Sequence, residues 1–248
     1  MDDCLYKLLE TINTSGYKAY IVGGYVRDSI LGFDNKDIDV VTNTPVNMLL
    51  SLFSLYKPKE LKNNTITFKY FEYNIDITQM RSEVFNGKYT DIQHTSDLKL
   101  DYLRRDFTFN AIYIDKNLNY TDFDNCINDL KNKKLRFIGD PYIKCKEDPT
   151  RLIRGIYFIL KYDLNEYDCI FSFKLTNDDI KNIDVNSLNK QIIKILKLNK
   201  NSEFIYFLEK CGIYNYLFKN KDKNYDVKPM DFLNNNGYIY YDSFCSNK

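Results

Sequence analysis

The positions of apolar residues along the chain predict alternating helices and strands in its first half. Apolar residues recur every three or four positions in residues 2–15, which predicts an amphipathic helix, and residues 17–22 then have the composition of a strand. A glycine pair ends this strand, and another helix and strand are expected at 25–31 and 38–42. Farther along, the pattern predicts a helix beginning at Pro45, strands at 65–70 and 73–78, a loop at 82–97, a helix at 98–111 and a strand at 112–114.

The period of the pattern changes near residue 140. Beyond Asp140 the apolar residues recur at helical spacing, in residues 152–160, 192–196 and 204–208, which predicts that this half is all helix. We therefore expect an α/β head with a mixed sheet, followed by a small all-helical neck. The expected boundaries are 1–140 for the head, 141–220 for the neck and 221–248 for a short tail.

Composition and charge limit the function classes only in part. The 35 Lys and Arg residues nearly balance 34 Asp and Glu, so a nucleic acid has to be bound by a local basic surface rather than by a global field. The six cysteines have no CxxC spacing, which argues against zinc and disulfides and favours a reducing compartment, the cytoplasm, with an organelle left open. The acidic N-terminus is unlike a signal peptide, and no apolar run has membrane-spanning length.

The segment GGYVRDSILGFDNKDIDV contains the first candidate site. Gly23 and Gly24 allow the backbone to approach a phosphate, the following helix start offers free N–H groups, and Arg27 adds a guanidinium. Asp37 and Asp39 lie two apart on a predicted strand, so both side chains point to one face and can share metal ions. Each piece alone is ordinary, since Arg27 and Asp28 fit a surface pair, but the assembled order predicts a metal–triphosphate site.

A third carboxylate usually completes such a cluster. Asp76 alternates with Ile75 and Ile77 on a later predicted strand, and we expect it to join Asp37 and Asp39. Two Mg²⁺ ions held there would activate an attacking hydroxyl and neutralise the leaving pyrophosphate, with Asp37 and Asp39 as the catalytic pair.

Together these motifs resemble the class II tRNA nucleotidyltransferase (CCA-adding enzyme) and bacterial poly(A) polymerase family. RRDFTFNA, residues 104–111, is similar to that family's ribose and triphosphate motif, and EDPTRLIRGIYF, residues 147–158, to its nucleobase-selecting motif. Residues 122–141 resemble the segment that links head to neck. The matches run in the family's order from about residue 17 to about residue 218 and cover most of the chain.

The resemblance implies a role for each matching residue. Arg105 joins Gly23, Gly24 and Arg27 at the triphosphate, while Asp106 and Asn110 contact the ribose, whose 2′-hydroxyl suits carboxylate and amide groups. The alternative for residues 104–106 is a salt-bridge cluster on a helix surface, and Phe107 and Phe109 are expected in the core.

In the second motif, Asp148 and Arg151 would select the nucleobase and Arg154 would reach phosphate. The plainer alternative is that Asp148 caps the helix beside Pro149 while the two arginines extend over the surface.

The chain departs from the family pattern at several positions. Tyr157 replaces a third arginine, and residues 125–128 replace a familiar glycine pair. His94, in the family's flexible loop, is expected to have no catalytic duty. The tail is short, so tRNA contact would be reduced, supplied by a second subunit, or provided by the basic segments 131–136 and 190–200, while the aromatic segment 238–244 suits packing or base stacking.

The sequence therefore predicts a nucleotidyltransferase-fold head and helical neck in a short form of this family. The expected activity is addition of CCA to the 3′ end of tRNA from CTP and ATP, with the nucleotide in the cleft between head and neck and with neither DNA nor a membrane as partner. A CC- or A-only enzyme, a poly(A) polymerase and a non-catalytic RNA-binding relic remain as alternatives, and the oligomeric state stays open.

Overall fold

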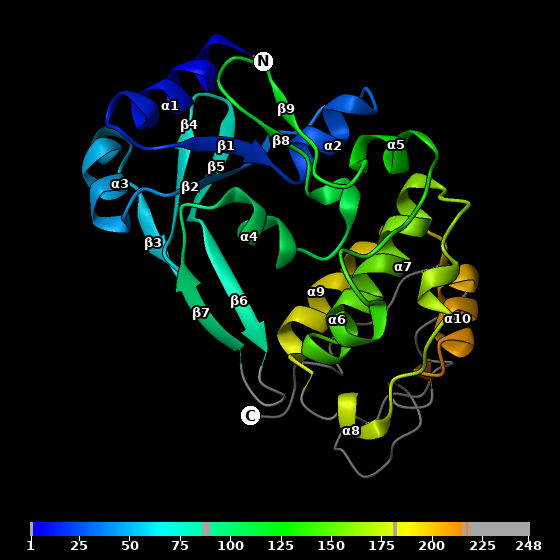
Figure 1. The fold of residues 1–248 in the computed structure, drawn as a ribbon. Helices are drawn as coiled ribbons and strands as arrows, with labels where there is room; N and C mark the ends of the chain where they lie inside the picture. The colour runs from blue at the N-terminus through cyan, green and yellow to red at the C-terminus, as the bar shows by residue number, and fades with distance from the viewer. Residues whose placement is uncertain (1, 86–89, 181–182, 215–216, 218–248) are drawn as a thin grey trace. The chain divides into compact units, whose positions relative to one another are not determined.

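The computed structural model describes residues 2–85, 90–180, 183–214 and 217 (Figure 1). Contacts divide the chain into two compact units, Met1–Asn132 and Lys133–Lys248. The domain boundaries expected at residues 140 and 220 stay a prediction. The predicted tail and the aromatic segment at 238–244 lie outside the described residues.

A mixed sheet forms the centre of the first unit. Within the described residues it has seven strands in the order β3-β4-β5-β2-β1-β8-β9 (Figure 1). The β2–β5 pair is parallel and the other neighbouring pairs are antiparallel. The strands are β1 Ala19–Val22, β2 Asp37–Thr42, β3 Lys59–Leu61, β4 Thr65–Tyr70, β5 Tyr73–Gln79, β8 Tyr113–Ile114 and β9 Tyr120–Thr121.

Three helices of this unit follow the apolar pattern of the sequence. Helix α1 (Asp3–Thr14) packs on β1 and on α3 (Val46–Leu52), and α2 (Gly24–Ile30) packs on β1 and β2 (Figure 1). The apolar stripe of α1 is wholly buried, because its members recur on one side of the helix. These residues are Leu5, Leu8, Leu9 and Ile12.

Two expectations for the first unit are wrong. Residues 82–97 are not a loop, because β6 (Arg81–Phe85) pairs with β7 (Thr90–His94) as an antiparallel two-stranded sheet. The sequence lacks alternation here because neither face is buried: Val84 is 60% exposed and Ile92 is 45% exposed.

The helix expected at 98–111 is also too long. Helix α4 ends at Leu103 (Leu98–Leu103), and Phe107 has extended backbone angles before a 3-10 helix at Thr108–Asn110. Phe107 and Phe109 are both buried, as expected. The Asp106 carboxylate accepts from the backbone N–H of Phe107, the donor that a continuing helix would need for its own hydrogen bond. Helix α5 (Cys126–Lys131) follows β9 in the same unit.

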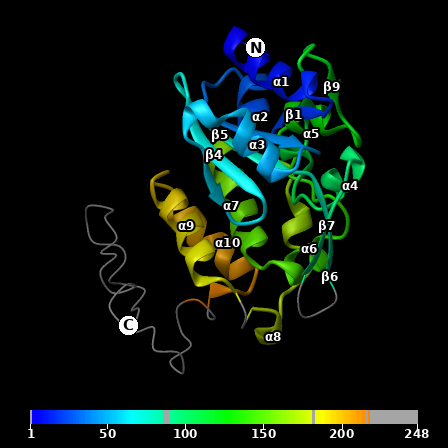
Figure 2. The same ribbon diagram turned by 90° about the vertical axis from the view of Figure 1, so that its left-hand side faces the viewer.

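The described part of the second unit is helical, as expected. Helix α7 packs against α9 and α10, which Figure 2 shows beside it. None of the helices described in either unit has the length and apolar composition that crossing a membrane requires. The helices of the second unit are α6 Pro141–Glu147, α7 Thr150–Tyr162, α8 Asn177–Ile180, α9 Val185–Leu196 and α10 Asn201–Lys210, with a 3-10 helix at Asp168–Ile170.

Candidate active site

Three carboxylates lie on one face of two neighbouring strands. In the parallel pair of β2 and β5, Asp39 is directly opposite Asp76, and Asp37 is opposite Asn74. Successive side chains of a strand point to opposite faces, so Ile38 is buried while Asp37 and Asp39 are exposed. The three residues that the sequence analysis grouped as metal ligands are therefore brought together on one face.

The electrostatics of this face favour a bound cation. Desolvation by the surrounding protein raises the pKa of the Asp39 carboxyl, although the residue is exposed at the surface. The positive charge of Arg105 lowers the same pKa. The charges of Asp76 and Asp37 raise that pKa further, and Arg27 opposes them. A cation between the carboxylates would relieve their repulsion.

The ligand set fits Mg²⁺ bound together with a substrate. In the described part of the chain, no group of three or more acidic, cysteine or histidine side chains encloses a metal site. Mg²⁺ needs no such cage, because one or two carboxylates suffice when water and substrate phosphates supply the other oxygens. Asn74 Nδ2 donates to Asp37 Oδ1 at 2.9 Å, which fixes that carboxylate.

The glycine turn lies directly against Asp39. Gly23 has φ 80° and ψ −137°, which an L side chain rarely adopts, and a Cβ there would lie 2.8 Å from Asp39 Oδ2. Gly24 begins α2, and a Cβ there would lie 3.2 Å from Asn35 Nδ2. The turn therefore places the N-terminus of α2 beside the carboxylates.

Arg27 is buried and joins two motifs that are far apart in sequence. Its Nε donates to Asp28 Oδ1 at 3.0 Å, and its Nη1 donates to Asn110 Oδ1 at 2.5 Å. Asn35 completes the arrangement, donating to Asp28 Oδ2 at 2.8 Å and accepting from the backbone N–H of Asp37. The alternative that Arg27 and Asp28 form a surface pair is wrong, since they are 5% and 4% exposed.

Arg105 is held by a buried carboxylate. Asp101 on α4 is fully buried and accepts from Arg104 Nη2 at 2.6 Å, from Arg105 Nε at 3.1 Å and from the Tyr113 hydroxyl at 3.0 Å. The salt bridges that the alternative expects are therefore present, but they are made to a buried carboxylate and not on an exposed helix surface. Asp106 Oδ1 accepts from the Phe107 backbone N–H at 2.8 Å, and its expected ribose contact stays a prediction.

In the second unit, the side chains of the expected nucleobase motif contact protein groups. Asp148 Oδ1 accepts from Thr150 N at 2.9 Å, the capping contact that the plainer alternative expects. Arg151 is buried, and its Nη1 donates to Glu147 Oε2 at 2.6 Å. Arg154 Nη2 lies 3.4 Å from Asp148 Oδ2. Selection of the nucleobase by Asp148 and Arg151 stays a prediction.

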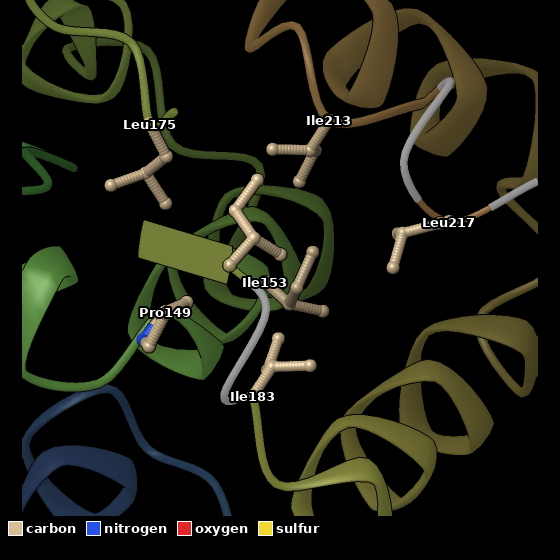
Figure 3. Close-up of a pocket in the computed structure, with 7 residues that line it drawn as sticks. Pro149, Ile153, Leu175, Ile183, Ile213 and Leu217 are labelled. Carbon is tan, nitrogen blue, oxygen red and sulfur yellow. The ribbon is translucent and has the colours of Figure 1, made fainter. Parts of the chain in front are cut away.

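A hollow in the same unit is unsuited to a nucleotide. Its lining is apolar and offers no side-chain group to a phosphate or a base edge (Figure 3). The labelled lining residues are Pro149, Ile153, Leu175, Ile183, Ile213 and Leu217. Outside this unit, His94 at the end of β7 is exposed and lies 2.8 Å from Asn64 Nδ2, and its expected lack of a catalytic role stays a prediction.

Sequence reasoning missed five residues that support the site. Asp28 and Asp101 could have been found from the sequence, because each is a carboxylate close to a candidate arginine. Asp28 directly follows Arg27, and Asp101 lies four positions before Arg105. For the other three, nothing in the local sequence marks the contact that each one makes. The five residues are Asp28, Asn35, Asn74, Asp101 and Tyr113.

Comparison with known proteins shows what the first unit is similar to. Residues 19–136 match the family model described as the poly A polymerase head domain. Over these residues the chain is similar to a poly(A) polymerase head domain. The resemblance inferred from the motifs is thereby confirmed, and the head contains the glycine turn, the three carboxylates and Arg105.

Similar proteins extend the match beyond the head. The CCA-adding enzyme of Staphylococcus epidermidis is 29% identical over 214 residues, 85% of this chain and 54% of that protein. The structure of apo form II of a CCA-adding enzyme has 25% identity and a TM-score of 0.75, covering 93% of this chain and 57% of the other. A complex of a CCA-adding enzyme with CTP has 26% identity and a TM-score of 0.69, covering 92% and 53%.

These likenesses confirm the expected fold, an α/β head followed by a helical portion. The chain spans about half the length of the curated relatives it matches.

Proposed function

We propose that this chain adds nucleotides from CTP and ATP to the 3′ end of tRNA, completing the CCA sequence. The observation that carries the proposal is the register that places Asp39 opposite Asp76 beside the Gly23 turn. Support also comes from the similar proteins, which are named CCA-adding enzymes and one of which is a complex with CTP.

Each part of the head has a task in this reaction. Asp37 and Asp39, with Asp76, would hold two Mg²⁺ ions. These ions would activate the tRNA 3′-hydroxyl and neutralise charge on the leaving pyrophosphate. The N-terminus of α2, Arg27 and Arg105 would bind the triphosphate, because backbone N–H groups and guanidinium groups suit phosphate oxygens.

The remaining candidate residues would position the sugar and the base. Asn110, already bound to Arg27, would place the ribose close to the triphosphate, and Asp106 would accept from a ribose hydroxyl. In the second unit, Asp148 and Arg151 would recognise the base and Arg154 would contact phosphate, which requires Asp148 to exchange its contact with Thr150 for one with the base.

A product-length assay tests the proposal. The protein, Mg²⁺, labelled CTP and ATP are incubated with tRNA transcripts that end before CCA, and products are resolved at single-nucleotide length. We expect three added nucleotides, and Asp39→Asn should lower the rate by at least about a hundredfold, since it removes a charged metal ligand. Asp34→Asn is the matched control, because Asp34 is an exposed aspartate just before β2 and should leave the rate unchanged.

The other outcomes separate the alternatives. Addition of two cytidines or one adenosine indicates a CC- or A-only enzyme, and a long adenosine ladder indicates a poly(A) polymerase. Absence of product in a folded protein that still binds tRNA supports the RNA-binding relic and overturns the proposal.

A further inference from the structure

A buried ionic cluster lies at the end of α4. Asp101, Arg104, Arg105 and Tyr113 form this group, which we call the Asp101 cluster. Its carboxylate is fully buried, and the side chains of the two arginines are 14% and 16% exposed. Two guanidinium groups share one carboxylate, so the cluster carries one uncompensated positive charge in a poorly hydrated place.

The two arginines differ in their other partners. Arg104 Nη1 lies 3.8 Å from Glu83 Oε1 on β6, and Glu83 also accepts from Arg81 Nε at 2.8 Å. Within the described residues, Arg105 has Asp101 as its carboxylate partner and makes no ion pair besides. The uncompensated charge of the Asp101 cluster is therefore centred on Arg105.

The contacts of Arg105 fix one edge of its guanidinium group. Nε donates to Asp101 Oδ2 at 3.1 Å and to the Tyr113 hydroxyl at 2.9 Å, and Nη2 lies 3.0 Å from the same carboxylate oxygen. In the described part of the chain the remaining Nη1 makes no hydrogen bond. Tyr113, which accepts from Arg105, lies on β8, and β8 pairs with β1, whose residue Val22 is directly opposite Asp39. Arg105 is therefore held on the side of the sheet's strands that leads to the catalytic face.

We propose that Asp101 is a positioning residue that holds Arg105 with its Nη1 edge presented to the triphosphate of the incoming nucleotide. This inference rests on the proposed function, which assigns the triphosphate to Arg105. Tyr113 shares the task, because its hydroxyl donates to Asp101 and accepts from Arg105, closing a ring of hydrogen bonds around the fixed edge. A phosphate oxygen at Nη1 would then supply the negative charge that the Asp101 cluster lacks.

A double-mutant cycle on nucleotide binding tests the inference. The dissociation constant of CTP with Mg²⁺ is measured by calorimetry, without RNA, for the wild type, Asp101→Asn, Arg105→Ala and the double variant. We expect Arg105→Ala to weaken binding by about tenfold or more, and Asp101→Asn to weaken it by a comparable factor. The double variant should bind no more weakly than Arg105→Ala alone, because Asp101 acts through Arg105.

Two further variants separate positioning from stability. Tyr113→Phe removes only the hydroxyl and should weaken CTP binding a few-fold, so it carries the test if Asp101→Asn does not fold. Asp122→Ala removes a carboxylate that caps Cys126 N and Ile127 N in the same unit, and should lower the melting temperature without changing CTP affinity.

The outcomes distinguish this inference from the proposed function. Unchanged CTP affinity in Arg105→Ala overturns the triphosphate role of Arg105. Two other results would overturn the positioning role of Asp101 alone, provided that Arg105→Ala weakens CTP binding as expected. One is a double variant in which the losses of affinity of the two single variants multiply. The other is unchanged CTP affinity in folded Asp101→Asn or Tyr113→Phe.

Discussion

Replacing Gly23 by alanine tests the close contact between the glycine turn and Asp39. The substitution adds one methyl group and removes no charge. The new Cβ would lie 2.8 Å from Asp39 Oδ2, a separation that real Cβ atoms do not show. Because the residue that the new methyl group would contact, Asp39, is a candidate metal ligand, the substitution should affect catalysis more than folding.

The magnitude follows from two effects. An L residue at φ 80° and ψ −137° costs about 1–3 kcal/mol of stability. Relieving the contact requires the separation to grow from 2.8 Å to the 3.4 Å of ordinary van der Waals contact, so the carboxylate moves by about 0.6 Å. Metal–ligand distances tolerate only about 0.2 Å, and a misplacement of about 1 Å costs about a hundredfold in rate, so we expect a loss of about 10- to 100-fold.

Gly32→Ala is the matched control. Gly32 follows α2 and has φ +79°, close to that of Gly23, but a Cβ there would meet no atom within 4 Å. It should lower stability by about 1 kcal/mol through backbone strain while leaving the rate unchanged. Single-turnover addition of CMP to tRNA, measured across Mg²⁺ concentrations beside thermal unfolding, reports both quantities for both variants.

The comparison has a clear refuting result. If the folded Gly23→Ala variant keeps the wild-type rate and Mg²⁺ dependence, the turn does not constrain Asp39 in catalysis. Equal rate losses in the two variants would attribute the effect to backbone strain and remove the contact from the explanation.

Two further predictions concern stability. Burial alone raises the pKa of Asp101, but the charges of Arg105 and Arg104 outweigh it and hold that pKa below its ordinary value. Stability from a depressed pKa is complete above the unfolded value of about 4 and is lost as the pH falls through the folded value. In urea unfolding, the advantage of the wild type over Asp101→Asn should therefore stay constant between about pH 8 and pH 5 and narrow below about pH 4, whereas an advantage that persists to about pH 2 would contradict this account. Separately, Asp184 caps α9 by accepting from Asn186 N and Ser187 N, so Asp184→Ala should lower the free energy of unfolding by about 1 kcal/mol, and an unchanged value would show that the cap is dispensable.

Local features of the chain were predictable from the sequence. The stripe of α1, the strand at residues 65–70 and the shared face of Asp37 and Asp39 depend only on side chains a few positions apart. Such spacings are fixed by the geometry of a helix or a strand, whatever lies elsewhere in the chain.

Where burial did not follow a local period, prediction failed. The strands at 81–85 and 90–94 carry no alternating pattern, because neither face of that pair is fully buried. The helix at 98–111 was overextended, because apolar spacing does not reveal that the Asp106 side chain takes the backbone N–H of Phe107.

By itself, then, the sequence determined the kinds of element, the acidic pair on one strand and the family motifs. Only the tertiary structure decided that Asp76 lies opposite Asp39, that Arg27 binds Asn110 and that Asp101 holds Arg105. The physical reason is that periodicity depends on neighbours along the chain. Strand register and buried ion pairs instead depend on which distant surfaces exclude water together.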